Sequence, residues 1–286
     1  MIIGLVRRAV ICPGPQNSMH STRFDTRCRG AESSPPRWLT VIHSVFVMLS
    51  AGLLAMLMLG CVSPPAEGRI GQRTEKFISG GRPIKVEVFA PESAGRVPAV
   101  LVLYGSGGAL VGKGEMVRLC RELSRTGHVA MLVHYFNRTG SLWSTDEKND
   151  RLWPVWADTV KDAVTFAAAH PQVDPDAIGL FGYSLGGFLA VEEATRNPRV
   201  RAVAELAGGL FAGRKPAVRR MPPVLVLHGR EDQRVPVKQA FAIAQAARET
   251  GTRPTVKIYE GEGHALSSAA LQDAMTRTRE FFRRTL

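Results

Sequence analysis

The feature that most constrains the fold is a regular alternation of short β-prone runs with amphipathic helical stretches between residue 84 and the end of the chain. Several runs, such as AVLVLY at 99–104 and AIGLFGY at 177–183, are apolar throughout, which indicates strands that are covered on both faces. Strands that alternate with helices build an α/β domain with a mostly parallel central sheet and helices on both faces. The length after Gly60 suits a single domain. We predict strands at 84–89, 99–104, 129–135, 177–183, 202–207, 223–228 and 255–260, and helices at 114–125, 155–170, 186–196, 237–250 and 271–286.

One strand end carries a candidate nucleophile. The run at 177–183 leads into GYSLGG at 182–187 and then into a helical stretch. In a parallel α/β sheet, ligands bind beyond the carboxyl ends of the strands. A sharp turn would present the Ser184 hydroxyl there, and glycine at 182 and 186 would avoid Cβ atoms where backbone segments approach each other. Two interpretations remain open, because Ser184 is either a nucleophile at the apex of the turn or a residue that caps the helix.

Two further strand ends supply the groups that a serine nucleophile requires. A serine hydroxyl is a poor nucleophile near neutral pH and needs a base, which in turn needs an orienting carboxylate. Asp232 follows the strand predicted at 223–228, and His264 follows the strand predicted at 255–260. Each alone is an ordinary turn or loop residue, but their order in the chain is that of a serine, acid and histidine triad. Glu231 is the alternative acid if the turn is offset by one residue.

From residue 75 to its end, the chain resembles the α/β-hydrolase superfamily and, within it, the dienelactone hydrolase family. The segments that carry the resemblance are 182–187, 228–236 and 261–264. The resemblance implies an α/β-hydrolase fold over 75–286. It also implies Ser184 as nucleophile, Asp232 as acid and His264 as base, acting on a small-molecule ester or lactone through an acyl-enzyme. Family members use cysteine as the nucleophile, so the activity expected here is that of a serine esterase, a carboxylic ester hydrolase.

Acyl transfer also requires N–H donors for the negative oxygen of the tetrahedral intermediate. The backbone N–H of Leu185, directly after the candidate nucleophile, is the first donor. The glycine-rich loop GSGG at 105–108 follows a predicted strand, and its amides can approach a ligand closely. By resemblance to the family, the second donor of this oxyanion hole is the N–H of Ser106, with Gly107 as the alternative. Tyr104 stands where the family often has histidine.

An apolar stretch precedes the predicted domain. Residues 38–60 contain no lysine, arginine, aspartate or glutamate, and arginines lie before them. The stretch is long enough to enter or cross a bilayer. We therefore predict a targeting segment at 1–60 and a linker at 61–74, with the basic flank on the cytoplasmic side and the domain on the other.

The end of this stretch resembles the signal of bacterial lipoproteins. The tetrapeptide MLGC at 58–61 resembles a lipobox, and the resemblance implies lipidation of Cys61 as the first residue of the mature protein. An uncleaved membrane anchor and an ordinary cleaved signal are the alternatives. All three place the domain on the periplasmic or extracytoplasmic side of the cell envelope, and the first two attach it to the membrane through a lipid or an anchor.

Composition restricts the partners and cofactors. The formal net charge is +12, but the arginines are scattered without a long basic run or an aromatic platform, so we expect no nucleic-acid partner. Cys120 is the single cysteine of the predicted domain, which excludes a disulfide framework. We assign no carboxylate or cysteine at metal-ligand spacing to His134, His170 or His228, and we expect neither a metal nor another cofactor. The sequence does not indicate an oligomeric state.

Three other functions compete with the esterase. Residues 107–114 nearly spell a phosphate-binding loop, but Gly114 stands where serine or threonine would ligate magnesium. A prolyl-oligopeptidase-like peptidase has a similar triad order, although this chain has no room for the propeller of such enzymes. A noncatalytic envelope binding protein on a hydrolase scaffold is the third. Around the site, the tryptophans in 136–156 either cover an acyl pocket or pack onto the core, and Arg138 either binds a substrate carboxylate or is solvated.

Overall fold

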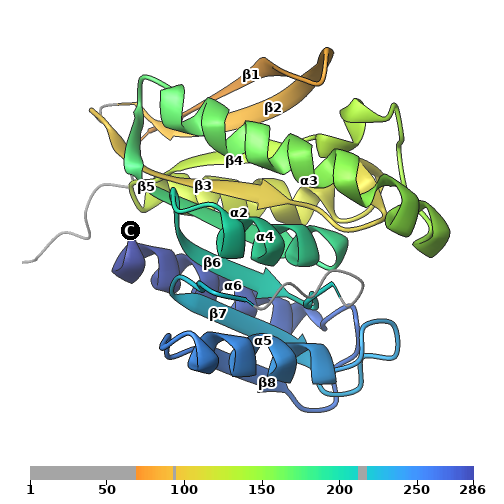
Figure 1. Cartoon of the computed structure of the whole chain (residues 1–286). Coiled ribbons are helices and arrows are strands. Elements are labelled where there is room, and N and C mark those ends of the chain that lie inside the picture. Colours follow the sequence, from red (N-terminus) through yellow and green to blue (C-terminus); the bar gives the residue numbers. More distant parts are fainter. Residues whose placement is uncertain (1–68, 93–94, 212–217) are drawn as a thin grey trace, which may run out of the picture. The chain divides into compact units, whose positions relative to one another are not determined.

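The computed structural model describes residues 69–92, 95–211 and 218–286. Its centre is one sheet with helices on both faces (Figure 1). The sheet consists of β1 (Ile70–Ser79), β2 (Arg82–Pro91), β3 (Val97–Leu103), β4 (Val129–Val133), β5 (Val173–Tyr183), β6 (Val200–Leu206), β7 (Val224–Gly229) and β8 (Thr255–Tyr259). Their spatial order is β1-β2-β4-β3-β5-β6-β7-β8. β2 is antiparallel to both of its neighbours, and all strands from β4 to β8 are parallel.

Helices cover both faces of the sheet. In the described ranges they are α2 (Lys113–Arg125), α3 (Asp146–Ala169), α4 (Leu185–Arg196), α5 (Lys238–Glu249) and α6 (Ser268–Thr285). Figure 1 shows α3, α4 and α5 on the near face and α2 and α6 on the far face. α2 contacts α6, and α3 contacts α4, so each face carries its own packed layer. This arrangement confirms the predicted α/β-hydrolase fold, a single domain around a mostly parallel sheet.

The two helical layers explain why the central strands are apolar at every position. All residues of β4 and β7 are buried, because a side chain on either face of these strands meets a helix. β8 lies at the edge and has only one buried residue, Tyr259. The apolar runs of the sequence therefore mark the centre of the sheet, where they form the core.

β1 was not predicted, and it moves the boundary of the domain. Residues 70–74 were assigned to the linker at 61–74, but they already belong to the sheet, so the domain begins before residue 75. Only two residues of β1 are buried, and its sequence therefore lacks an apolar run. The strand pairs with β2 along its whole length. Gly80 and Gly81 connect the two strands with φ values of 46° and 77°, which glycine adopts at little cost.

α3 begins nine residues before the predicted start at 155. Proline removes a helical hydrogen bond and usually ends a helix, so a helix that continues through Pro154 is not expected from local propensity. In the structure Pro154 lies inside α3. The side chain of Thr145 accepts the N–H of Lys148 and caps the first turn, and the flanking Trp153 and Trp156 are fully buried. Burial of two large aromatic side chains offsets the lost hydrogen bond.

The segment predicted at 1–60 and the proposed lipidation site Cys61 lie outside the described residues. Within the described part of the chain, no helix combines the length and the apolarity needed to cross a bilayer.

Candidate active site

Ser184 occupies the sharp turn between β5 and α4. Its φ of 53° lies in the left-handed region, and its N–H donates to Leu206 O at 2.9 Å. A Cβ at Gly182 would overlap the backbone of Gly186, and a Cβ at Gly186 would overlap the backbone of Leu103, so the close approach of these segments requires both glycines. Ser184 occupies the N-cap position of α4, but its side chain makes no capping hydrogen bond, so its hydroxyl is not used to cap the helix.

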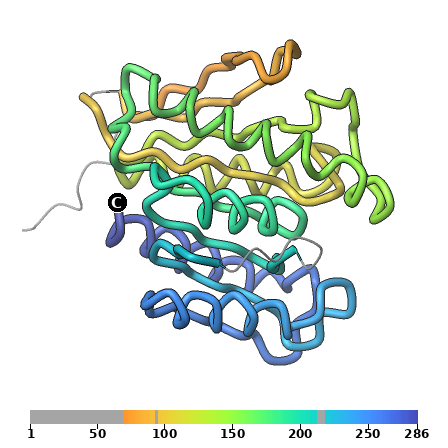
Figure 2. The backbone as a smooth tube through the Cα atoms, in the orientation of Figure 1, coloured from red at the N-terminus to blue at the C-terminus, as the bar shows by residue number. Residues whose placement is uncertain are grey.

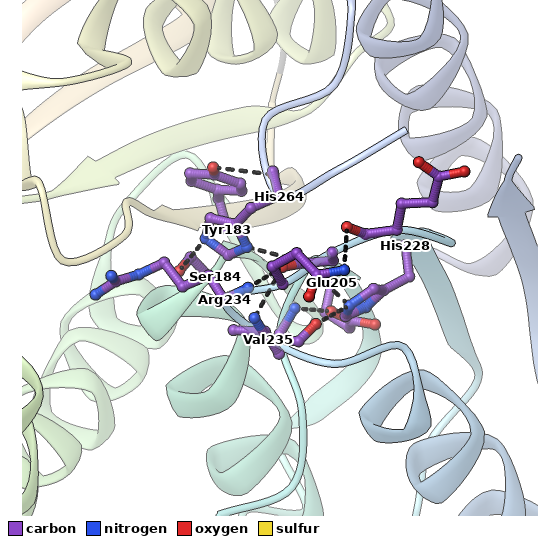
Figure 3. A network of polar contacts seen from close by, with 11 residues as sticks. Tyr183, Ser184, Glu205, His228, Arg234, Val235 and His264 are labelled. Carbon is purple, nitrogen blue, oxygen red and sulfur yellow. Dashed lines mark hydrogen bonds and ion pairs between the residues drawn. The ribbon is translucent and has the colours of Figure 1, made fainter. Parts of the chain in front are cut away.

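A chain of hydrogen bonds joins this serine to a histidine and a buried aspartate (Figure 3). His264 Nε2 lies 2.9 Å from Ser184 Oγ, and His264 Nδ1 lies 2.7 Å from Asp232 Oδ2. Asp232 Oδ1 accepts the N–H groups of Arg234 at 2.9 Å and Val235 at 2.8 Å. An ionised carboxylate only accepts hydrogen bonds, so Nδ1 carries the proton and Nε2 is free to accept the hydroxyl proton. The structure therefore brings together the three residues that the sequence singled out.

The residues beside this chain fix its geometry. The structure sets the carboxylate of Asp232, and not that of the exposed Glu231, against the imidazole. Tyr183 donates its hydroxyl to the backbone O of His264 at 3.2 Å, and its ring lies 5.5 Å from the imidazole. Burial and the neighbouring Asp232 raise the pKa of Tyr183, so this tyrosine remains a neutral donor. The residue before the serine thus holds the histidine loop, a role that the sequence did not indicate.

Both residues predicted to supply oxyanion donors line the cavity beside Ser184. Leu185 is the first residue of α4, where a backbone N–H has no acceptor within the helix. Ser106 lines the same cavity as Ser184. The Ser106 loop is held by a hydrogen bond from Ser144 N to Ser106 O at 2.8 Å and by Tyr135, whose hydroxyl donates to the backbone O of Tyr104 at 2.8 Å. The loop is therefore anchored on the core side, next to the cavity that Ser106 lines.

Comparison with known proteins assigns the chain to a family. The model of the dienelactone hydrolase family matches residues 84–285. The chain belongs to this family. Its members are hydrolases, so the chain is a hydrolase. Among relatives, a protein of Methylorubrum extorquens named "Putative carboxymethylenebutenolidase" is 26% identical over 220 residues, which cover 68% of this chain and 74% of that one.

Two more distant proteins are similar over part or most of the chain. Esterase YpfH of Escherichia coli is 24% identical over 130 residues, which cover 46% of this chain and 54% of that one. The crystal structure of a dienelactone hydrolase-like promiscuous phosphotriesterase from metagenomic libraries superposes with a TM-score of 0.67 at 21% identity, over 76% of this chain and 99% of the other. At this level of identity the superposition shows a shared fold.

In this member of the dienelactone hydrolase family, a cavity of about 300 Å³ opens beside Ser184. Trp153 stacks on Phe211 with ring centroids 4.1 Å apart, and both line the cavity. Trp156 is fully buried in the core, and Trp143 is half exposed. The tryptophans of this segment therefore divide between the two interpretations that the sequence left open. The remaining apolar lining comes from Leu185, Phe188, Leu210 and Val235.

Polar side chains also line the cavity, namely Ser106, Asp146, Asn149, Asp150, Ser184, Arg234 and Gln239. Arg234 donates to Asp146 Oδ1 at 3.0 Å, and both residues line the cavity. Arg138, which the sequence offered as a ligand of a substrate carboxylate, does not line it and donates instead to the backbone O of Gly80. The cavity next to the serine thus combines an apolar and aromatic side, which suits acyl or alkyl groups, with polar and charged side chains.

Two buried titratable residues behind Asp232 were not recognised in the sequence. His228, at the end of β7, donates from Nε2 to Val235 O at 2.8 Å and lies 3.4 Å from Asp232 Oδ2. Burial lowers the pKa of His228 and keeps it neutral. Glu205, on β6, is 0% exposed, and burial together with the Asp232 charge raises its pKa to about 8. A glutamate within the apolar run AVAELA was the available signal.

The structure gives the phosphate-loop segment another role. Lys113, the lysine of that pattern, lies at the start of α2 and pairs with Glu87 on β2 at 2.8 Å. A phosphate-binding lysine must reach the phosphates, but this one contacts a buried carboxylate. Among the described residues, no three histidine, cysteine, aspartate or glutamate side chains are grouped as ligands of a metal ion.

Proposed function

We propose that this chain is a serine hydrolase that cleaves carboxylic esters or lactones of small molecules through an acyl-enzyme. The observation that carries the proposal is the continuous hydrogen-bond chain from Ser184 Oγ through His264 to the buried Asp232. Leu185 and Ser106 line the same cavity as Ser184, and we expect their amides to bind the negative oxygen. Nucleophile, base, orienting acid and oxyanion donors are the parts that acyl transfer needs.

The reaction proceeds in two halves. In the first, His264 Nε2 takes the proton of Ser184 Oγ while Oγ bonds to the substrate carbonyl carbon, and the carbonyl oxygen becomes negative between the two amides. The intermediate then expels the alcohol oxygen, which receives the proton from His264, and the acyl group stays on the serine. In the second half, water takes the place of the serine, its proton passes through His264, and the Ser184–acyl bond breaks to release the acid. Asp232 stays ionised and stabilises the imidazolium in both halves.

Serine in place of cysteine separates this chain from the chemistry implied by the family. A serine hydroxyl is activated only by proton transfer to the base, whereas a thiol ionises more readily. The names of the relatives suggest a lactone and an ester as substrates, and we extend both classes to this chain as candidates. The apolar and aromatic side of the cavity favours an uncharged acyl or alkyl group beside the serine.

Labelling with a fluorophosphonate tests the nucleophile directly. The wild-type protein should bind one equivalent covalently, and Ser184→Ala should bind none while keeping the same melting temperature. Ser106→Ala serves as the matched control, because it removes another cavity hydroxyl and leaves the backbone amide in place. Equal labelling of Ser184→Ala would overturn the proposal, and so would a wild-type protein that does not react at all, as a noncatalytic binding protein would not.

A substrate panel distinguishes the classes of hydrolase. We expect turnover of p-nitrophenyl esters with short acyl groups and of an unsaturated lactone, and no cleavage of a prolyl peptide amide. Peptide cleavage without ester cleavage would instead support a prolyl-oligopeptidase-like peptidase. Activity towards esters should fall in acid solution, because a protonated imidazole cannot accept the serine proton.

We also propose that residues 1–60 direct the hydrolase to the cell envelope and that Cys61 carries a lipid. The proposal rests on the uncharged stretch at 38–60 and the lipobox-like sequence that follows it. Metabolic labelling with a palmitate analogue should mark the full-length protein in the membrane fraction, and Cys61→Ala should abolish the label. A labelled Cys61→Ala protein, or a wild-type protein without label, would contradict lipidation.

A further inference from the structure

Glu205 is a buried carboxyl group that the proposed mechanism does not use. It lies on β6 and is 0% exposed. Its Oε2 accepts the N–H of Gly208 at 2.6 Å, whereas Oε1 has no hydrogen-bond partner among the described residues. A buried, ionised carboxylate needs several donors, because the loss of water is otherwise uncompensated. With one donor for two oxygens, Glu205 is a poor site for a negative charge.

The neighbouring triad acid is the better site. Asp232 accepts two backbone N–H groups and the Nδ1–H of His264, and His228 Nε2 lies 3.4 Å away. Asp232 and Glu205 repel each other when both are ionised, and this raises the pKa of Glu205 beyond the effect of burial. Of two nearby carboxyl groups, the one with fewer donors keeps the proton.

In the described part of the chain, the charged neighbour of Glu205 is Asp232, which is itself an acid and cannot balance a negative charge. Figure 3 shows Glu205 in one network with Tyr183, His228 and His264, together with the loop that carries Asp232. Burial keeps Tyr183 and His228 neutral at pH 7. From α4, the packed neighbour is Gly187, whose Cα lies against Gly208 and offers no side chain. Among these described groups, only the catalytic imidazole becomes a cation, when it is protonated.

Glu205 also supports the turn on which the nucleophile rests. Ala207 has a φ of 54°, an uncommon value for a residue with a Cβ, and its N–H donates to Leu227 O at 2.9 Å. The next N–H, that of Gly208, donates to Glu205. Leu206 O, at the start of this turn, accepts the N–H of Ser184. Two hydrogen bonds thus hold a strained turn that is bonded directly to the serine.

We propose that Glu205 carries a proton at neutral pH and acts as a positioning residue for the active site, holding the turn behind Ser184 without adding a second negative charge beside Asp232. This inference rests on the proposed serine hydrolase function. If so, the activity of the protein should decrease in alkaline solution. When Glu205 loses its proton, a buried carboxylate with one donor faces the ionised Asp232, and the turn at residues 206–208 is destabilised. Burial places this loss near a pKa of about 8.

The pH profile of kcat/KM separates this role from a purely structural one. The activity of the wild-type protein should fall about tenfold per pH unit above the Glu205 pKa, as expected for a group that must stay protonated. Glu205→Gln, whose amide mimics the protonated acid, should retain most of the activity at pH 7 and lose the alkaline decline. Glu205→Ala should lose activity at every pH, because Gly208 then lacks its acceptor.

Glu193→Gln is the matched control. Glu193 is a second buried glutamate with a pKa raised by burial, but it lies on α4 and accepts from Asn197, away from the catalytic histidine. Its substitution should leave the alkaline decline in place. A decline that persists unchanged in Glu205→Gln, or that disappears in Glu193→Gln, would overturn the proposal.

A stability measurement tests the proton on Glu205 without any activity. A carboxyl group with a raised pKa in the folded state binds its proton more tightly there than in the unfolded chain, so the wild-type protein loses stability as the pH rises from about 4.5 to 8. Glu205→Gln lacks this loss, and the difference in melting temperature between it and wild type should grow over that range. A constant difference would refute the inference even if fluorophosphonate labelling supports the serine hydrolase. Absent labelling with a growing difference would refute the proposed function and confirm the proton.

Discussion

Two groups of buried titratable residues lie at different places in the sheet. They differ in how the burial of a carboxyl group is compensated. On β2, Glu87 contacts Lys113 at 2.8 Å, His134 at 2.9 Å and Lys85 at 3.2 Å. Burial alone would raise the pKa of Glu87, but hydrogen bonds from these three residues outweigh it and lower the pKa to about 2. Behind the triad, Glu205 has a single backbone donor, and its pKa is raised to about 8.

The difference separates a structural charge from a functional one. Glu87 is ionised and compensated, so its charge ties β2, β4 and the start of α2 together. At the carboxyl ends of β5, β6 and β7, donors are concentrated on Asp232, and its neighbours remain neutral. The second arrangement leaves one negative charge to stabilise the imidazolium of His264, which is what acyl transfer requires. Substitutions in the two groups should accordingly affect different properties.

The largest effect is expected for Asp232→Asn. The amide can still accept backbone N–H groups, but its NH₂ would face His264 Nδ1 and favour the tautomer that cannot accept the serine proton. We expect kcat to fall by about 10⁴, with little change in melting temperature. Steady-state kinetics with a p-nitrophenyl ester measure the loss. A decrease in kcat of less than tenfold would show that the group of residues around Asp232 does not serve catalysis.

Glu87→Gln should show the opposite behaviour. The free energy of unfolding at pH 7 should fall by about 1–3 kcal/mol, less than for a fully buried ion pair because the two lysines are about 40% exposed. Since the pKa of Glu87 is lowered in the folded state, its stabilising effect is present above about pH 4.5 and disappears as the pH falls towards 2. Denaturant unfolding at pH 7 and pH 3 should therefore give a smaller difference at pH 3. If Glu87→Gln instead left the stability unchanged and abolished the esterase activity, Glu87 would have a functional role and not a structural one.

The smallest effect is expected for Tyr183→Phe, which keeps the ring beside the imidazole and removes the hydrogen bond to His264 O. A net hydrogen bond contributes about 1 kcal/mol, so kcat should fall about fivefold with KM unchanged. Tyr259→Phe is the matched control, because its hydroxyl bonds to Asp273 on α6. Equal kinetic effects of the two substitutions would show that the hydroxyl of Tyr183 does not position the histidine.

The sequence predicted the elements that have a strong period, and it missed those that tertiary contacts stabilise. Each predicted strand range overlaps a strand of the sheet from β2 to β8. β1 has two buried residues and exists because β2 offers a complete pairing edge. The first turns of α3 form despite Pro154 because Trp153 and Trp156 have a core to enter. Such contacts are formed by residues far apart in the chain and leave no local pattern.

The active-site residues divide in the same way. Ser184, Asp232 and His264 follow strands, and a parallel sheet places those ends along one edge, so their proximity could be predicted from order alone. Tyr183 and Glu205 could not be assigned, because their roles depend on which side chain or backbone atom lies opposite them.

The sequence by itself determined the parallel sheet, the strained serine turn and the order of the three triad residues, because periodicity, glycine spacing and strand ends are local properties. The tertiary structure decided which carboxyl group is ionised, which side chains line the cavity and which residue holds the histidine loop. Those properties depend on the number of donors and the amount of water around each group, and both are set when distant segments pack together.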